Sequence, residues 1–371
     1  MRIEPWYHLL IQMKLLIVSP QPIFPPNDGG RARVYHLAKA LSELHEVHVA
    51  CPPGEGEPRV PFTTHPLPSG GIRRQIGNPN LVPHLRRLIL EIGPDVVQVE
   101  QIWQVPWAAI AAARTGATLV LDATNVEHQR FRGMGARVWP LIRLWEIAAV
   151  RLAGTVFAVS DEDLAALRKL GTNRNKFHLV PNGYDGTTFH PNDAARLALR
   201  DRLAVEDDEP LLLFFGLLSY PPNSEALEIL RQEIVPKLDA SELRFRLIVA
   251  GKDPPDELLE DERLQYVGMV DDIAAHINAA DAVLVPLRSG GGTRLKILET
   301  IACGTPVVST TIGAAGLDVA VCSPLLTLAD DWDGFVEAVI AASRTKQRAG
   351  PQPGFGQTYD WANIARGMSY Q

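Results

Sequence analysis

The sequence predicts an α/β protein made of two Rossmann-like, doubly wound domains. Three observations predict this fold: short runs rich in Val, Ile and Leu alternate with helical patterns, the alternation comes in two series, and a turn-rich segment separates the series. Continuous apolar strands separated by helices are what a parallel sheet covered on both faces requires. At roughly 150 residues per domain, 371 residues suffice for two cores. Two such lobes imply a central cleft at the carboxyl ends of strands.

The predicted strands of the first series are 15–19, 47–51, 96–100, 118–122, 156–160 and 177–180, and those of the second are 211–215, 245–250, 264–267, 282–286 and 306–309. Residues 52–80 are rich in Pro and Gly and predict a long loop with one strand near 60–66. The turn-rich stretch 181–186 is the expected linker. We therefore predict domains at 13–185 and 186–345, a C-terminal tail at 346–371 whose helix packs back on the lobes, and an extension of no assigned role at 1–12.

Composition excludes several classes of protein. The charged content of 21% is ordinary, which argues against a disordered chain, and no apolar run approaches the roughly 20 residues of a membrane span. The three cysteines are scattered, without CxxC spacing, which argues against disulfides and a cysteine metal site and favours a reducing compartment. No secretory signal is recognisable. We expect a cytoplasmic protein, and no nucleic acid among its partners.

The net charge of −7 hides an asymmetry. Residues 1–185 carry 20 basic and 16 acidic side chains, whereas residues 186–371 carry 16 and 27. A basic first half is typical of an anionic partner, such as a phosphorylated substrate or the inner face of a membrane, although these charges could equally serve solvation. Residues 131–153 place four arginines among apolar residues, which fits either a helix lying on a membrane or, more commonly, a helix with its apolar stripe in the core.

The strongest motif follows the strand at 282–286. Three glycines, Gly290–Gly292, precede a helix expected to start near Thr293, with Arg294 and Lys296 in its first turn and Glu299 further along. Glycine backbone N–H groups and a helix N-terminus attract an anion, and two cations there fit a bound diphosphate. A carboxylate at Glu299 could accept hydrogen bonds from vicinal sugar hydroxyls.

A second glycine pair, Gly29-Gly30, follows the first strand and precedes a helix. With Arg31 and Arg33 nearby, it could also approach an anion, although a loop with a helix cap at Asp28 would look similar. It is not the G-x-G-x-x-G dinucleotide fingerprint, and this argues against an NAD-dependent oxidoreductase.

Residues 13–345 resemble the family 4 type of retaining nucleotide-sugar glycosyltransferases, which have the GT-B fold. The resemblance rests on the order and spacing of several motifs together: Gly29-Gly30 with Arg33, Asp122-x-x-Asn125-x-Glu127, Val159-Ser160, the segment Val180 to Asp185, Phe214-x-Gly216, Ile248-x-Ala250-Gly251, Val267-Gly268-x-Val270, and Leu298-Glu299 through Val308.

The resemblance implies an N-terminal acceptor domain, a C-terminal donor domain, and transfer from a nucleotide diphosphate sugar, usually without a metal or other cofactor. Glu299 would bind the donor ribose, and Met269 and Val270 would frame the base through backbone groups. The other donor-binding residues would be Gly216, Gly291, Gly292, Thr293, Arg294 and Lys296. Gly29, Gly30, Arg33 and Asn125 would lie on the acceptor side of the cleft, and Asn182 would shape the hinge.

Two departures from the family pattern matter. A glutamate usually stands eight positions before Glu299, where this chain has Gly291. We expect the backbone N–H groups of Gly291 and Gly292 to contact sugar hydroxyls instead. The family also places an Arg and a Lys after the first C-terminal strand, and residues 216–223 contain neither. We expect Arg294 and Lys296 to substitute for them and to stabilise the leaving diphosphate, with Glu127 or His128 orienting the acceptor hydroxyl.

Two alternative functions remain open from the sequence: a UDP-sugar 2-epimerase type of enzyme, and a non-catalytic sugar-nucleotide-binding subunit. The acceptor is not specified. A glycan, a lipid-linked or a small-molecule acceptor would each fit, with a role in cell-surface polysaccharide, glycolipid or related synthesis and a peripheral membrane contact through the basic N-terminal domain.

Overall fold

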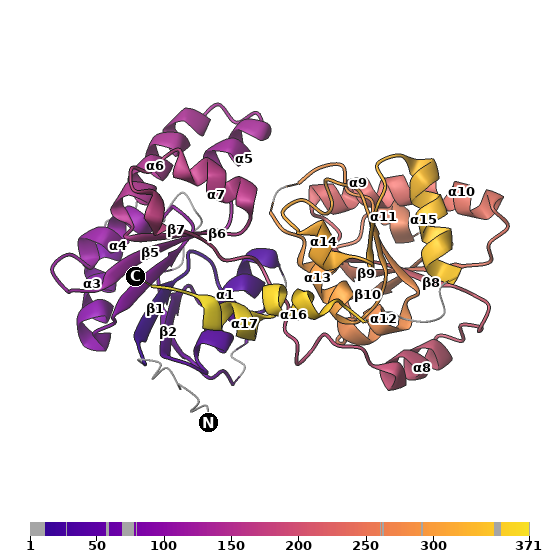
Figure 1. The fold of residues 1–371 in the computed structure, drawn as a ribbon, viewed down its shortest axis with the longest axis horizontal. Coiled ribbons are helices and arrows are strands. Elements are labelled where there is room, and N and C mark those ends of the chain that lie inside the picture. The colour runs from indigo at the N-terminus through magenta and orange to yellow at the C-terminus, as the bar shows by residue number, and fades with distance from the viewer. Residues whose placement is uncertain are drawn as a thin grey trace, which may run out of the picture. The chain divides into compact units, whose positions relative to one another are not determined.

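The computed structural model describes residues 12–26, 28–56, 59–68, 78, 80–259, 261, 263–290, 292–344 and 350–370 (Figure 1). The chain forms two compact units, one of residues 1–180 with 365–371 and one of residues 181–364. The division therefore falls five residues before the predicted boundary. The C-terminal tail is divided too, because residues up to 364 belong to the second unit and the remainder to the first.

The first unit is built on a seven-stranded parallel sheet of order β3-β2-β1-β4-β5-β6-β7. Its strands are β1 (Lys14–Val18), β2 (Glu46–Cys51), β3 (Thr63–Pro66), β4 (Val96–Glu100), β5 (Thr118–Ala123), β6 (Thr155–Ala158) and β7 (Phe177–Leu179). Its helices are α1 (Gly29–Leu41), α3 (Leu81–Ile92), α4 (Val105–Ala111), α5 (Glu127–Gly133), α6 (Trp139–Leu152) and α7 (Asp161–Arg168), with a 3₁₀ turn at Arg174–Lys176. The single helical pattern expected over 131–153 is thus two helices.

The second unit is built on a six-stranded parallel sheet of order β10-β9-β8-β11-β12-β13. Its strands are β8 (Leu211–Leu217), β9 (Arg246–Lys252), β10 (Leu264–Gly268), β11 (Ala282–Val285), β12 (Val307–Ser309) and β13 (Leu326–Leu328). Its helices are α8 (Asp193–Arg202), α9 (Pro221–Ile229), α10 (Val235–Ala240), α11 (Asp256–Leu259), α12 (Ile273–Ala279), α13 (Leu295–Ala302), α14 (Val319–Cys322), α15 (Trp332–Arg344) and α16 (Pro353–Tyr359), with a π-helical turn at Leu230–Ile234.

The two sheets confirm the predicted α/β fold and every predicted strand. Strands β4, β6 and β11 are buried along their whole length, as a sheet covered by helices on both faces requires. Strand β13, an edge strand of three residues, was not predicted.

The linker and the tail pair with each other within the second unit. The Tyr184 N–H donates to the carbonyl of Tyr359 over 2.8 Å, and the Trp361 N–H donates to the carbonyl of Tyr184 over 3.1 Å. Gly183 allows this close approach, since a Cβ at that position would lie 2.6 Å from the Tyr359 carbonyl oxygen. Helix α17 (Trp361–Gly367) then continues into the first unit.

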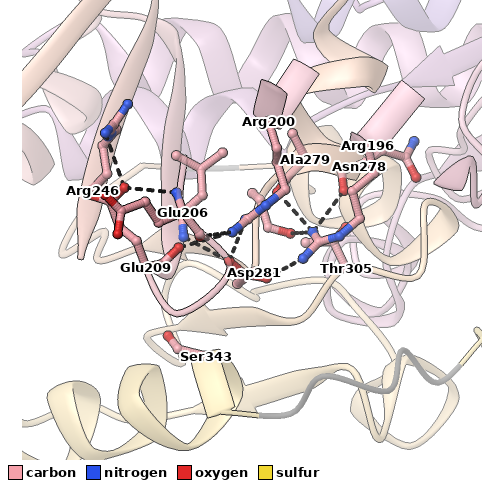
Figure 2. A network of polar contacts seen from close by, with 12 residues as sticks. Arg196, Arg200, Glu206, Glu209, Arg246, Asn278, Ala279, Asp281, Thr305 and Ser343 are labelled. Atoms are coloured by element: carbon pink, nitrogen blue, oxygen red, sulfur yellow. Dashed lines mark hydrogen bonds and ion pairs between the residues drawn. The ribbon is translucent and has the colours of Figure 1, made fainter. Parts of the chain in front are cut away.

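Asp281 joins helix α8 to the sheet of the second unit (Figure 2). Its carboxylate accepts hydrogen bonds from Arg196 over 2.5 Å and from Arg200 over 2.9 Å. It also accepts the Leu211 N–H over 2.8 Å, at the first residue of β8. Because Arg200 is almost buried, its charge depends on this carboxylate for compensation.

We expect Asp281→Asn to destabilise the second unit by about 2–3 kcal/mol, the cost of weakened charge-assisted hydrogen bonds. Urea denaturation of the variant and the parent checks this. Glu206→Gln is the matched control, because its ion pair with Arg244 is largely exposed and should contribute under about 1 kcal/mol. Equal losses for the two variants would contradict the role assigned to Asp281.

Candidate functional site: a donor site in the second unit

The predicted anion motif forms the connection between β11 and α13. Helix α13 begins at Leu295, two residues later than predicted, with Arg294 as its N-cap residue in extended backbone. The helix buries Ile297, Leu298 and Ile301 against the core, because these positions follow helical spacing. Packing of the apolar face sets the position of the polar residues at the start of the helix.

Lys296 is held at the carboxyl end of β8. Its Nζ donates to the carbonyl oxygen of Phe215 over 2.7 Å and to Asn223 Oδ1 over 3.1 Å, and it lies 4.8 Å from the centre of the Phe214 ring. Burial lowers the pKa of Lys296 to about 7, with a further contribution from the positive Arg294. Its hydrogen-bond partners among the described residues are thus neutral oxygens.

Glu299 lies one turn further along α13. Burial raises its pKa to about 7, and Lys296 opposes this rise only in part. No described residue donates a hydrogen bond to this carboxylate. The two groups therefore both titrate near neutral pH, and a ligand that carries negative charge and hydroxyl groups could stabilise the charged form of each.

The residues directly before α13 are also polar and partly buried. The Arg294 guanidinium donates to the carbonyl of Gly292, and burial lowers the pKa of Arg294. The hydroxyl oxygen of Thr293 is buried and has no hydrogen-bond partner within the described residues. Gly291 lies outside the described residues, so its expected backbone contact stays a prediction.

Gly216 stands where β8 approaches Lys296. Its φ of +146° is a conformation that other residues rarely adopt, and a Cβ would lie 3.0 Å from Asn223 Nδ2 and 3.2 Å from Lys296 Nζ. Glycine is therefore required for both its conformation and its lack of a side chain. Met269 and Val270 follow β10; Met269 is 71% exposed, whereas Val270 is half-buried against the core.

In the first unit, Arg33 is buried and pairs with Asp122. Its Nε and Nη2 donate to the two carboxylate oxygens over 3.0 and 2.8 Å, and Nη2 also donates to the Val180 carbonyl over 3.0 Å. Burial by itself lowers the pKa of Arg33, but Asp122 more than offsets this and leaves the pKa raised. The expectation that Arg33 meets an external anion is therefore corrected: its charge is already compensated inside the unit.

Further buried polar groups surround this pair. Gln98 Nε2 donates to Glu100 Oε1 over 3.0 Å, and the Tyr370 hydroxyl donates to Gln98 Oε1 over 3.2 Å. Burial, with the nearby Asp122, raises the pKa of Glu100 well above its usual range. Tyr370 comes from the C-terminal tail, so the tail supplies part of the first unit's interior.

The Glu127 carboxylate also has a partner within the first unit. Its carboxylate accepts hydrogen bonds from Arg130 over 3.0 and 2.8 Å, and its backbone N–H donates to Glu146 Oε1 over 2.8 Å. Burial raises the pKa of Glu127 in spite of Arg130. His128 bonds to the other oxygen of Glu146. These contacts account for Glu127 without any ligand, and its expected role with the acceptor stays a prediction.

The remaining predicted residues are placed as follows. Gly29 and Gly30 are exposed at the start of α1, where Asp28 caps the helix by accepting the Arg31 N–H over 3.0 Å. Asn125 is half-buried before α5, and Asn182 is buried in the linker. The helix-cap interpretation of Asp28 is thereby confirmed.

The sequence analysis missed two residues that shape the donor site. Asn223 holds Lys296, and Glu225 accepts a hydrogen bond from Ser289 over 2.9 Å. Both lie in α9, which begins within the segment 216–223 that lacks the family's cations. No spacing rule connects α9 with a helix some seventy residues later, so only the fold reveals the pairing. Within the described ranges, no cluster of three or more His, Cys, Asp or Glu that could hold a metal is found.

Comparison with known families gives a class that agrees with this geometry. Residues 27–187 match the family described as Glycosyltransferase Family 4, and residues 209–344 match the one described as Glycosyl transferases group 1. A D-inositol 3-phosphate glycosyltransferase from Xylanimonas cellulosilytica is 36% identical over 174 residues, covering 41% of this chain and 38% of that protein. The chain spans 38% to 64% of the length of the first three such relatives.

Solved structures agree on the fold. Sucrose-phosphate synthase from Thermosynechococcus elongatus has a TM-score of 0.73 at 18% identity, over 96% of this chain and 97% of that one. An Anabaena protein solved with UDP-glucose has a TM-score of 0.70 at 18% identity, over 96% and 98%. A UDP-GlcNAc 2-epimerase from Methanocaldococcus jannaschii shares the fold less closely, with a TM-score of 0.58 at 16% identity, over 95% and 97%.

The two parallel-sheet units have the GT-B fold of these solved structures, and each of the two units matches a family of glycosyltransferase domains. More particularly, the first unit carries the Glycosyltransferase Family 4 domain and the second carries the Glycosyl transferases group 1 domain.

The raised pKa of Glu299 predicts a pH-dependent stability of the unliganded protein. Between pH 4.5 and about 7 the folded chain binds this proton more tightly than the unfolded chain, so the stability contributed by Glu299 falls as the pH rises. Lys296 acts in the opposite sense between about pH 7 and 10.5, where only the unfolded chain keeps its proton. Glu299→Gln should therefore remove the decline below pH 7, measured by urea denaturation from pH 4.5 to 8.

Lys296→Met serves as the comparison, because it should flatten the rise above pH 7. A free-energy difference between Glu299→Gln and the parent that does not change from pH 4.5 to 7 would contradict the assignment.

Proposed function

We propose that the chain transfers a hexose from a nucleotide diphosphate sugar, bound by the second unit, to an acceptor hydroxyl, with retention of configuration and without a metal. Lys296 and Arg294 bind the diphosphate, and Glu299 binds the ribose. The observation that carries the proposal is the half-buried Lys296, whose amine donates hydrogen bonds to neutral oxygens at the carboxyl end of β8. Ligands of doubly wound sheets bind at this edge.

Electrostatics favours a diphosphate there. Keeping the Lys296 amine charged is costly, because burial lowers its pKa to about 7. An adjacent diphosphate offsets that cost, because its negative charge raises the pKa of the amine and keeps it protonated. The N-terminal end of α13 adds partial positive charge, and the Thr293 hydroxyl supplies a donor. As the bond to the sugar breaks, negative charge accumulates on the leaving diphosphate, which these groups stabilise. Two cations supply the role that a metal has in other transferases.

The position of Lys296 also supports the substitution inferred from the sequence. The family's usual cations follow the first strand of the C-terminal domain, and the Lys296 Nζ lies 2.7 Å from a carbonyl at the end of that strand, β8. A lysine from α13 thus delivers its charge to the place from which the usual pair is missing. In our proposal the backbone N–H groups of Gly291 and Gly292 contact the sugar in place of the absent glutamate.

The donor and the acceptor are proposed from the comparisons. UDP-glucose is the first donor to test, because a structure of the same fold was solved with it. The name of these relatives, D-inositol 3-phosphate glycosyltransferase, points to a phosphorylated polyol acceptor, which also fits the basic surplus of residues 1–185. Lipid-linked and polysaccharide acceptors carry phosphate or hydroxyl groups too, so the acceptor panel includes them.

We expect UDP release from UDP-glucose to depend on an acceptor and to be unchanged by EDTA. Product NMR should show the same anomeric configuration as the donor, and myo-inositol 3-phosphate is the first acceptor to test. Inversion would contradict retention, and loss of activity in EDTA would contradict metal independence. A 2-epimerase would convert UDP-GlcNAc without an acceptor, and a binding subunit would bind UDP without turnover.

Arg294→Ala should weaken UDP binding about tenfold to hundredfold, as expected for one charge-assisted hydrogen bond. Thermal unfolding with UDP, GDP, ADP and dTDP measures this, since saturation at a hundred times Kd stabilises by about 2.7 kcal/mol. Arg288→Ala is the matched control: this arginine lies in the same loop but stacks on Trp332, 4.9 Å from its ring centre. Unchanged affinity in Arg294→Ala would overturn the proposed diphosphate site.

A further inference from the structure

Large apolar side chains are concentrated on the outer surface of the first unit, around helix α6. Fifteen large apolar side chains are well exposed in the described part of the chain, and five of them fall within residues 134–152. They are Met134, Val138, Leu141, Leu144 and Leu152, exposed by 71%, 50%, 68%, 62% and 49%. Such a concentration is unusual for a surface in contact with water alone.

These side chains do not belong to the packed core of the first unit. Helix α6 packs its other side inward, where Ile142, Ala149 and Val150 are buried and Glu146 accepts the Glu127 N–H. Leu141, Leu144 and Leu152 follow at spacings of three and eight residues, which place them on the opposite, outward side of the helix. Figure 1 shows α5 and α6 as the outermost helices of this part of the unit. The outward side is therefore apolar although the inward packing is complete.

The charges on this surface have one sign. Between residues 130 and 152 the chain has five arginines, and its one acidic residue, Glu146, is buried. Arg137, Arg143 and Arg151 form no ion pair with a described residue, and Arg132 stacks on Trp139. We call the surface formed by the five exposed apolar residues with Arg137, Arg143 and Arg151 the α6 outer face. It combines apolar side chains with uncompensated positive charge.

We propose that the α6 outer face docks the first unit on the surface of an anionic phospholipid bilayer. The leucines would enter the boundary between headgroups and acyl chains, while the arginines keep their guanidinium groups at the level of the lipid phosphates. The charge pattern selects this partner, because an acidic membrane surface complements a face with no exposed acid. No helix in the described ranges is long and apolar enough to cross a membrane, so the contact would be interfacial. This proposal does not depend on the proposed function.

Sedimentation of the purified full chain with vesicles tests the proposal. We expect binding to phosphatidylcholine vesicles containing 30% phosphatidylglycerol, weaker binding as salt is raised, and little binding to phosphatidylcholine alone. Arg137→Gln/Arg143→Gln should weaken binding roughly 25-fold, at about fivefold per charge. Leu141→Glu/Leu144→Glu should weaken it at least tenfold, because it removes apolar contact and adds repulsion.

Leu197→Glu is the matched control and should bind like the parent. Leu197 is also 68% exposed and lies on an arginine-rich helix, α8, but in the second unit. Circular dichroism and the thermal shift with UDP show that each variant is folded. Equal binding to both kinds of vesicle, or unchanged binding of the α6 variants, would overturn the proposal. So would a dimer that Leu141→Glu/Leu144→Glu dissociates while the parent ignores vesicles, because the face would then join two copies of the chain.

Discussion

The hydrogen bond from Lys296 to the Phe215 carbonyl is the constraint around which the proposed donor site is arranged. It joins the first turn of α13 to the end of β8, two elements some eighty residues apart in the chain. Gly216 must remain a glycine because the amine lies so close, and Asn223 in α9 completes the support. A loop, a strand and two helices are thereby fixed around one titratable charge. Its position depends on ordinary core packing beneath α13.

Charged side chains in both units are matched by partners of opposite charge. In the first unit, Arg33 is matched by Asp122, and Glu127 is matched by Arg130. In the second, Asp281 likewise compensates Arg196 and Arg200. Lys296 and Glu299 are the contrast, because their pKa values have moved toward each other and toward neutrality. Perturbed groups of this kind gather at functional sites, whereas the matched pairs are structural.

The fold could be predicted from the sequence because parallel strands buried on both faces are continuous apolar runs, and all of these but the three-residue β13 stand out. The cations of the proposed donor site could be singled out too, since Arg294 and Lys296 adjoin the glycines in the chain. The internal partner of Arg33 could not be predicted, because Asp122 is 89 residues away in the chain. Asn223 and Tyr370 were missed because their contacts depend on which elements the folded chain brings together.

The C-terminal tail also determines the order in which the units can be completed during synthesis. The second unit is inserted into the first between residues 180 and 365, so all of its residues leave the ribosome before the first unit has received its last segment. Tyr370 provides a hydroxyl to Gln98 and an aromatic contact to Phe157, with ring centres 5.7 Å apart. The half of the protein that is translated first is therefore the half that is finished last. Until Tyr370 has been synthesised, Gln98, which donates to Glu100, lacks the hydrogen bond from the Tyr370 hydroxyl.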